Sequence, residues 1–243
     1  MSFPSATRLS EEQIFSTYTA ERVPVGTLGM TEDGRLFRFC ENGGVAQLVA
    51  RFYQSEVPSA NGLNEVVGTM AAGATVITAV GATTADIAAD ALKEGYVFSL
   101  TAADLNPAYR IKSNTLIPEA TDTGTITLYS PLQAAIAAAS TISYFKNPYR
   151  DVVVAVATTP DAFVCGVAVQ AIALDAFGWL QSRGPARVLA GGTTYVIGDP
   201  VGPGGVAGSA IPIAATELTV PVYGHVLVAA TNAEMGIVFV QID

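Results

Sequence analysis

The chain has 243 residues, of which 50% are hydrophobic and only 14% are charged, and its formal net charge is −9. Soluble domains average about 25% charged residues, so this chain has few charges with which to cover its core, and we expect partner chains to cover part of its surface. The negative charge opposes binding to nucleic-acid phosphates and to an anionic membrane surface, whereas it suits solubility or a basic protein partner.

The first 22 residues are predicted to form an N-terminal arm. Ser10 followed by Gln13 fits a capping box, and the segment EEQIFSTY can form one or two helical turns. The opening residues MSFPSATRLSEEQ contain no basic segment followed by an apolar run, so we expect no secretory signal.

From Val23 onward the pattern favours strands. The short apolar runs GTLGMT and RLFRFC flank Glu32-Asp33-Gly34, which predicts a β-hairpin. The run VAQLVARFYQ fits either a strand or a short helix, because periodicity alone does not separate the two. Glycine and threonine recur among valine and isoleucine over residues 66–80, which favours strands there.

The segment TADIAADALKEG, residues 84–95, is the best candidate for a helix. Ile87, Ala91 and Leu92 recur at helical spacing, and Gly95 stands where a C-terminal cap is expected. A helix of this length is too short to organise the fold.

Strand-like runs account for most of the remaining sequence. YVFSL, YRIKS, TITLYS and VVVAVA are separated by corners rich in turn residues, and the β signal is nearly continuous after Asp151. Regular turn signals of this kind are typical of a sandwich or barrel. The predicted fold is mainly β, with antiparallel sandwich or barrel-like domains, an extended N-terminal arm and one or two short helices. The expected division is an arm over residues 1–22, a β-rich domain over 23–150 and a β-barrel or sandwich over 151–243.

Two long uncharged runs, residues 66–85 and 123–145, reach the length of a membrane span. Both are rich in threonine, glycine and alanine, and neither has a basic flank that would orient it. We therefore predict that they are parts of the β fold.

The residue types that carry chemistry are sparse. Cys40 and Cys165 stand far apart without a partner motif, so we expect two small buried hydrophobes. His225 is the single histidine, which excludes a His-rich zinc site, and no Gly-x-Ser-x-Gly elbow accompanies it. GPGGVA at 202–207 matches a dinucleotide fingerprint, but prolines flank it where a strand and a helix are required. We predict no enzyme activity, no cofactor and no metal site.

The stretch DAFGWLQSRGPARVL, residues 175–189, contains the only tryptophan. Strand alternation places Phe177, Trp179 and Gln181 on one face. Gly184-Pro185 is predicted to turn the chain into the next run. Phe177 and Trp179 are therefore interpreted as structural anchors in the core or at an interface, in preference to a ligand-stacking site.

Several short motifs follow one another in a distinctive order along the chain. They are VGT at 25–27, DGRLF at 33–37, GYV at 95–97, YRI at 109–111, ITL at 126–128, NPYR at 147–150, and FGWLQ at 177–181 with RGPA at 183–186. In this order and spacing they resemble the capsid decoration (cement) proteins of tailed bacteriophages, and the likeness covers most of the chain from about Val23.

The resemblance implies a β-rich, trimeric virion protein, made in the host cytoplasm, that sits on the outer surface of the capsid. Its partners would be the major capsid protein, whose neighbouring subunits it clamps, and two further copies of itself. No cofactor is implied. The arm would strap across the capsid or a neighbouring protomer, with Phe3, Ile14 and Phe15 as apolar contacts.

Two other classes of function stay open at this point. One is a virion fibre or receptor-binding protein that recognises host surface glycan, which exposed tyrosine, tryptophan and carboxylate side chains in a groove would favour. The other is a glycan-cleaving enzyme on a β scaffold, although no pair of carboxylates is selected by its spacing.

Overall fold

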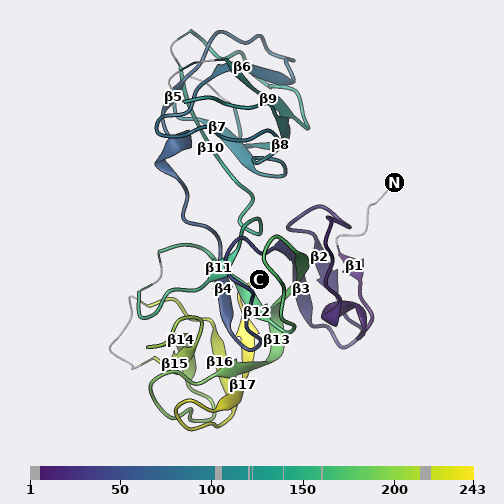
Figure 1. Ribbon diagram of the computed structural model, residues 1–243, viewed down its shortest axis with the longest axis vertical. Helices are drawn as coiled ribbons and strands as arrows, with labels where there is room; N and C mark the ends of the chain where they lie inside the picture. Colours follow the sequence, from purple (N-terminus) through teal and green to yellow (C-terminus); the bar gives the residue numbers. More distant parts are fainter. Residues whose placement is uncertain are drawn as a thin grey trace. The chain divides into compact units, whose positions relative to one another are not determined.

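The computed structural model describes residues 6–101, 106–119, 121, 123–138, 140–159, 161–213 and 220–243. The chain divides into two compact units (Figure 1): unit 1 consists of Met1–Val57 and Pro148–Asp243, and unit 2 of Pro58–Asn147. Unit 2 is thus inserted between two stretches of unit 1, which differs from the predicted order of an arm and two consecutive domains. Turn spacing did not reveal the insertion, because the strands that pair across it are far apart in the sequence.

Unit 1 is built on one large sheet, which contains eleven strands among the described residues. The main order is β1-β2-β3-β13-β17-β16-β14-β15; β12 also pairs with β13, and β4 lies between β12 and β11. Strand β1 runs parallel to β2, and the other named pairs in this sheet are antiparallel. The bounds are β1 Thr7–Arg8, β2 Leu28–Met30, β3 Leu36–Glu41, β4 Phe52–Gln54, β11 Val153–Val154, β12 Val164–Ala168, β13 Phe177–Leu189, β14 Pro200–Pro203, β15 Ala210–Pro212, β16 Gly224–Val228 and β17 Met235–Gln241.

Unit 2 is a nearly closed, antiparallel, barrel-like sheet with its own apolar core. Its strand order is β5-β10-β7-β8-β9-β6, and each of these pairs lies within the unit. A single 3-10 turn, η2, precedes the first strand. The bounds are η2 Ala60–Gly62, β5 Glu65–Val66, β6 Val76–Val80, β7 Tyr96–Ser99, β8 Tyr109–Asn114, β9 Gly124–Leu128 and β10 Thr141–Phe145.

The predicted mainly β fold is therefore confirmed. The hairpin around Glu32-Asp33-Gly34 joins β2 to β3. The two uncharged runs, residues 66–85 and 123–145, supply strands of unit 2. Within the described ranges, no helix is both long enough and apolar enough to span a membrane.

The start of the N-terminal segment contains the predicted capping box. The Ser10 backbone N–H donates to Gln13 Oε1 at 2.8 Å, and the Gln13 backbone N–H donates to Ser10 Oγ at 3.2 Å. The helix that follows is a single 3-10 turn, η1, at Gln13–Phe15. The reciprocal hydrogen bonds satisfy two backbone donors that a short turn otherwise leaves unpaired.

The rest of this segment is extended and is held against unit 1 by its own contacts. Strand β1 pairs with β2, and Tyr18 forms an isolated bridge with Phe177. Leu9 and Ile14 are buried in the core of the unit. Residues 6–22 therefore belong to unit 1, because their apolar side chains find partners within the same chain.

Strand β13 runs without interruption through Gly184-Pro185, so the turn predicted there is wrong. The pairing with β3 shifts register between Gln181 and Arg183, and Gly184 has a φ of 99°. The Gln181 side-chain amide donates to the carbonyl oxygens of Arg183 at 3.2 Å and Pro185 at 2.9 Å. A glycine and a bulge thus bend the strand, while its pairing with β17 continues on the other side.

The helix predicted over residues 84–95 is also wrong, because this segment forms a series of turns. Asp90 and Glu94 have φ values of 61° and 65°, which lie in the left-handed region and interrupt a right-handed helix. Ile87 forms a bridge with Ile117 instead of facing a helical neighbour.

The buried side chain of Asn114 supplies the hydrogen bonds that hold these turns. Its Oδ1 accepts from the Leu92 backbone N–H at 2.9 Å, and its Nδ2 donates to the carbonyl oxygens of Ala88 and Thr115, each at 2.8 Å. The Asp90 backbone N–H donates to the Asn114 carbonyl oxygen at 3.0 Å. Hydrogen bonds to the distant Asn114 therefore take the place of the local backbone hydrogen bonds that a helix would form here.

We predict that Asn114→Ala lowers the free energy of unfolding by about 1–3 kcal/mol, because it leaves the buried Leu92 N–H unsatisfied and removes two partly buried hydrogen bonds to the carbonyl oxygens of Ala88 and Thr115. Urea denaturation followed by circular dichroism measures this. Lys112→Ala, at an exposed position of the same strand, should stay within about 0.5 kcal/mol of the unmodified protein. Equal stabilities for the two variants would contradict the role given to Asn114.

Candidate interaction surfaces

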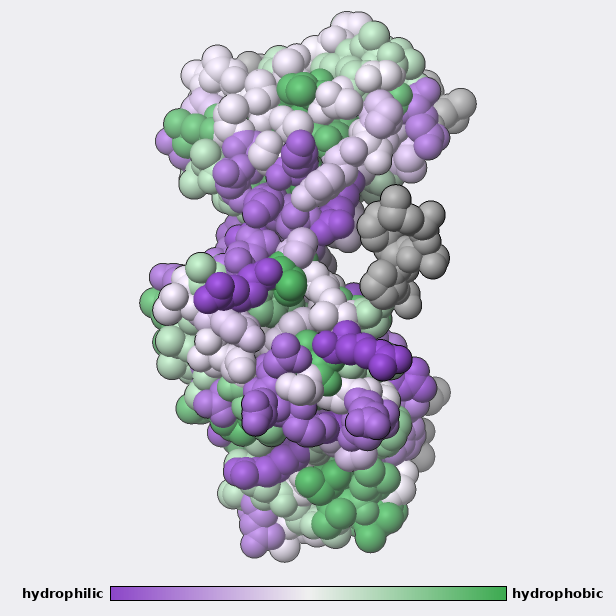
Figure 2. All heavy atoms as spheres, turned by 90° about the vertical axis from the view of Figure 1, so that its right-hand side faces the viewer, coloured by the Kyte–Doolittle hydropathy of each residue, from purple (hydrophilic) through white to green (hydrophobic). Residues whose placement is uncertain are grey.

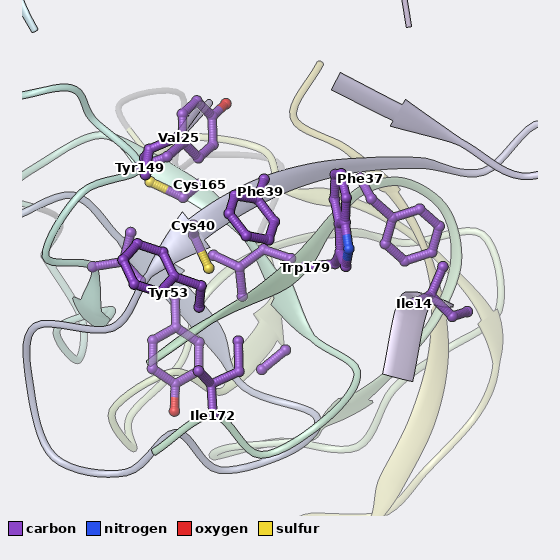
Figure 3. Packing of buried hydrophobic residues seen from close by; sticks show 14 of the residues in the cluster. Ile14, Val25, Phe37, Phe39, Cys40, Tyr53, Tyr149, Cys165, Ile172 and Trp179 are labelled. Carbon is purple, nitrogen blue, oxygen red and sulfur yellow. The ribbon is translucent and has the colours of Figure 1, made fainter. Parts of the chain in front are cut away.

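The only tryptophan lies in a cluster of buried apolar side chains in unit 1 (Figure 3). Trp179 on β13 pairs with Phe39 on β3, and the two rings meet edge to face with centroids 5.1 Å apart. Phe177 stacks on the same Phe39 ring at 5.9 Å. Only 4% of Trp179 is exposed, so Phe177 and Trp179 are core anchors, and Trp179 has no face on which a sugar ring could stack.

The three apolar residues of the arm fall in different places. Ile14 is 1% exposed and lies in the same core cluster as Trp179, so the contact with a partner expected for it is corrected to a contact within the chain. Phe15 is 51% exposed and keeps its place as a candidate contact. Phe3 lies outside the described residues.

Both cysteines are free and buried, as predicted. Burial raises the pKa of Cys40 to about 12, and it raises the pKa of Cys165 well above the ordinary thiol value. The Cys165 thiol lies 3.1 Å from the Pro148 carbonyl oxygen. Both groups are therefore neutral thiols at physiological pH, which makes them poor nucleophiles.

The other residues considered for ligand binding do not converge on a site. His225 is exposed on β16. GPGGVA at 202–207 begins in β14 and leads through a turn into β15, without the helix that a pyrophosphate would need. In the part of the chain that the structure describes, no group of three or more His, Cys, Asp or Glu residues could hold a metal ion.

A largely buried ion pair is formed by Glu41, the last residue of strand β3, and Arg150. Arg150 Nη1 donates to Glu41 Oε2 at 2.6 Å, and Arg150 Nη2 lies 3.6 Å from Glu21 Oε2. Burial raises the pKa of Glu41, while the Arg150 charge acts against this rise and the nearby Asp151 charge adds to it. The pair connects three segments of unit 1, and we assign it a structural role.

One face of the β13–β17–β16 sheet is turned away from the core. Inward residues such as Ala186 and Val238 belong to an apolar core cluster of unit 1. On the opposite face, Pro185 pairs with Phe239, which in turn pairs with His225, so these side chains form a row across three strands. We call this surface the outer face, and its members are Arg183, Pro185, Arg187, His225, Val228 and Phe239.

The outer face carries two cations without partners. Arg183 and Arg187 are exposed, and neither side chain forms an ion pair or hydrogen bond with a residue that the structure describes. By contrast, Arg35, Arg38 and Arg150 are all paired with carboxylates. Unpaired arginines beside exposed apolar groups are typical of protein interfaces, where arginine is enriched.

Apolar side chains continue from the outer face onto the end of unit 1 that holds β14–β17. Figure 2 shows hydrophobic residues gathered at this end. The exposed apolar residues there include Val196, Ile197, Leu227, Val228 and Met235. The Gly198 backbone N–H donates to the Val226 carbonyl oxygen at 2.9 Å, which holds the loop of Ile197 beside β16.

A second surface, which we call the acidic edge, joins the N-terminal segment to the β2–β3 hairpin. Arg35 connects the two segments through ion pairs with Glu11 and, at 2.7 Å, with Asp33. Hydrogen bonds from Thr31 and Arg35 lower the pKa of Asp33, so this carboxylate stays ionised. The members of the acidic edge are Glu11, Glu12, Phe15, Glu32 and Asp33.

A third surface consists of loops. The Asn42 side-chain amide donates to the Val45 carbonyl oxygen at 3.0 Å and to the Ile172 carbonyl oxygen at 3.0 Å, and so holds two loops together. Val45, Leu48 and Leu174 on these loops have exposed fractions of 80%, 61% and 54%. We call these three residues the loop surface. Apolar side chains this exposed need a partner if they are to leave water.

Sequence reasoning did not find these surfaces, although one signal was present. The run GIVFVQ of β17 is apolar at successive positions, whereas a strand with one face in water usually alternates apolar and polar residues. Apolar groups on both faces of a strand are more typical of a strand that is covered on both sides than of one with a face in water.

No protein-family model, curated protein sequence or solved structure matches the chain.

We predict that Trp179→Ala lowers the free energy of unfolding by about 3–5 kcal/mol, because it leaves a cavity in the aromatic cluster. Trp179→Phe is the matched control and should cost less. In the unmodified protein, tryptophan fluorescence should be blue-shifted and protected from acrylamide. Emission typical of a water-exposed indole in the folded protein would contradict the core assignment.

We also predict that a thiol reagent at pH 8 labels neither Cys40 nor Cys165 in the folded protein and labels both after denaturation. When the pH exceeds the ordinary pKa of a thiol, Cys40 loses its proton in the unfolded chain. In the folded chain Cys40 keeps this proton up to about pH 12. The unfolded state then binds fewer protons, so the free energy of unfolding falls as the pH rises through this window. Rapid labelling of the native protein would contradict this prediction.

Proposed function

We propose that the protein is a non-enzymatic virion structural protein that binds the outer surface of a phage head. In this role it cements neighbouring major capsid protein subunits and works as a homotrimer. The observation that carries the proposal is the set of exposed apolar surfaces on unit 1, in a chain with few charges and a resemblance in motif order to decoration proteins.

These surfaces suit assembly more than chemistry. The outer face, the apolar end and the loop surface together expose valine, leucine and isoleucine side chains that an isolated soluble protein usually buries. The thiols are buried, and the described carboxylates, cysteines and histidine form no metal cluster. The groups available at the surface are thus suited to binding other protein surfaces.

The physical setting of a capsid also fits a chain of this kind. Many copies on one particle bind the same repeating surface, so a modest affinity at each site is sufficient for stable attachment when the bound copies are connected. A protein that spans two capsid subunits stabilises the shell in which they are paired, because its binding free energy is lost when they separate.

The alternative of a glycan-binding fibre protein has less support. Trp179, the side chain best suited to stacking on a sugar, is buried in the aromatic core. No other observation on the described residues favours a glycan groove.

We predict that the purified protein binds expanded empty heads and raises the temperature at which they disassemble. Cosedimentation measures the binding, and calorimetry of the heads measures the stabilisation. Unexpanded heads are the control and should bind less, because the paired subunit surfaces are not yet formed. A protein that neither binds expanded heads nor changes their stability would refute the proposal, and binding to host cells alone would favour the fibre alternative.

A further inference from the structure

We propose that copies of this chain associate head to tail, with the outer face of one protomer docked on the acidic edge of the next. The inference deepens the proposed function and rests on its oligomeric part: it names the two surfaces through which the protomers meet. It does not require that the protein bind a capsid.

The charge balance of the chain restricts where two copies can meet. There are 21 acidic and 12 basic residues, so most pairs of surfaces brought together would repel. Arg183 and Arg187 on the outer face have no carboxylate partner among the residues that the structure describes. A neighbour's carboxylates can therefore approach this face with attraction.

The spacing on the outer face places an apolar group between the two cations. Arg183 and Arg187 are four residues apart on one face of β13, which corresponds to about 13 Å along the strand. Pro185 lies between them, and Phe239 lies beside Pro185 on the neighbouring strand. Arg187 lies level with Ile237, which pairs with the exposed Val228. The face therefore offers an apolar centre flanked by positive charge.

The acidic edge offers the complementary kinds of group, an exposed aromatic side chain and carboxylates. Phe15, with about half of its surface exposed, follows Glu12 by three residues and lies on the same 3-10 turn segment. Glu12 and Glu32 are exposed, and neither carboxylate has an ion-pair partner among the described residues. In the proposed contact Phe15 packs against the apolar centre of the outer face, and the two carboxylates pair with Arg183 and Arg187.

The two surfaces consist of different residues of the same unit, so the contact joins unlike patches. Such a heterologous contact forms a ring when its rotation closes, and in a ring of three every copy has both surfaces covered. A ring of this kind accounts for three features at once: the arginines of the outer face, the exposed Phe15 and the apolar β17 strand. A shell protein with an acidic surface is the competing occupant of the outer face, and the experiment below distinguishes it.

The test is a charge reversal followed by a charge swap, read by sedimentation velocity and light scattering without any capsid present. The unmodified protein should form a defined oligomer at micromolar concentration. The double variant Arg183→Glu/Arg187→Glu should raise the dissociation constant at least about tenfold, since two attractive pairs become repulsive. The matched control is Lys112→Glu, at an exposed site in unit 2, which changes the charge by the same amount as the single variant Arg187→Glu. The Lys112→Glu variant should leave association unchanged.

The decisive arm combines Arg183→Glu/Arg187→Glu with Glu12→Lys/Glu32→Lys. Restored association of this swapped protein would establish that these two surfaces face each other, and raised salt should weaken association of the unmodified protein. The inference would be overturned if the unmodified protein is a monomer or if the charge-reversed variant associates normally. It would also be overturned if the swapped protein fails to associate although its circular dichroism is unchanged.

Failure of this inference can be told apart from failure of the proposed function. A monomer that still binds expanded heads, and loses that binding on Arg183→Glu/Arg187→Glu, would assign the outer face to the shell and overturn the self-association alone. An oligomer that passes the swap test and ignores heads would refute the decoration role while leaving the interface in place.

Discussion

The pairing of β13 with β3 on one side and β17 on the other is the interaction on which the rest of unit 1 depends. The first half of β13 contributes Trp179 and Leu180 to one core cluster, and the second half contributes Ala186 and Val188 to another. One strand thus connects two apolar cores. Because β3 precedes unit 2 in the sequence and β13 follows it, this pairing also closes unit 1 around the insertion.

Burial on this scaffold decides which distinctive residues remain available for function. The tryptophan and both thiols are used in packing, and Ile14 anchors the N-terminal segment beneath the aromatic cluster. The surface keeps apolar and charged groups, which gather on the outer face, the acidic edge, the apolar end and the loop surface. The distinctive residues thus lie in the core, and the surface carries apolar and charged groups. Such a surface is suited to assembly with other proteins.

Much of the local structure followed from the sequence, because it depends on neighbours along the chain. The β2–β3 hairpin, the Ser10–Gln13 capping box and the buried state of the cysteines were all predicted from nearby residues. Predictions were wrong where distant groups override local preference. Asn114 holds residues 84–95 in turns despite their helical spacing, and β17 keeps β13 extended through Gly184-Pro185.

The sequence by itself determined that this is a β protein with too few charges to cover its surface. These properties follow from composition and from the period of two that strands impose. Only the tertiary structure decided that unit 2 is inserted, that Trp179 and Ile14 are internal while Phe15 is exposed, and that Arg183 and Arg187 lie on either side of Pro185, next to Phe239 of the neighbouring strand. Each of these depends on which distant strand lies next to β13, and cross-strand register is a property of the folded chain that no local pattern specifies.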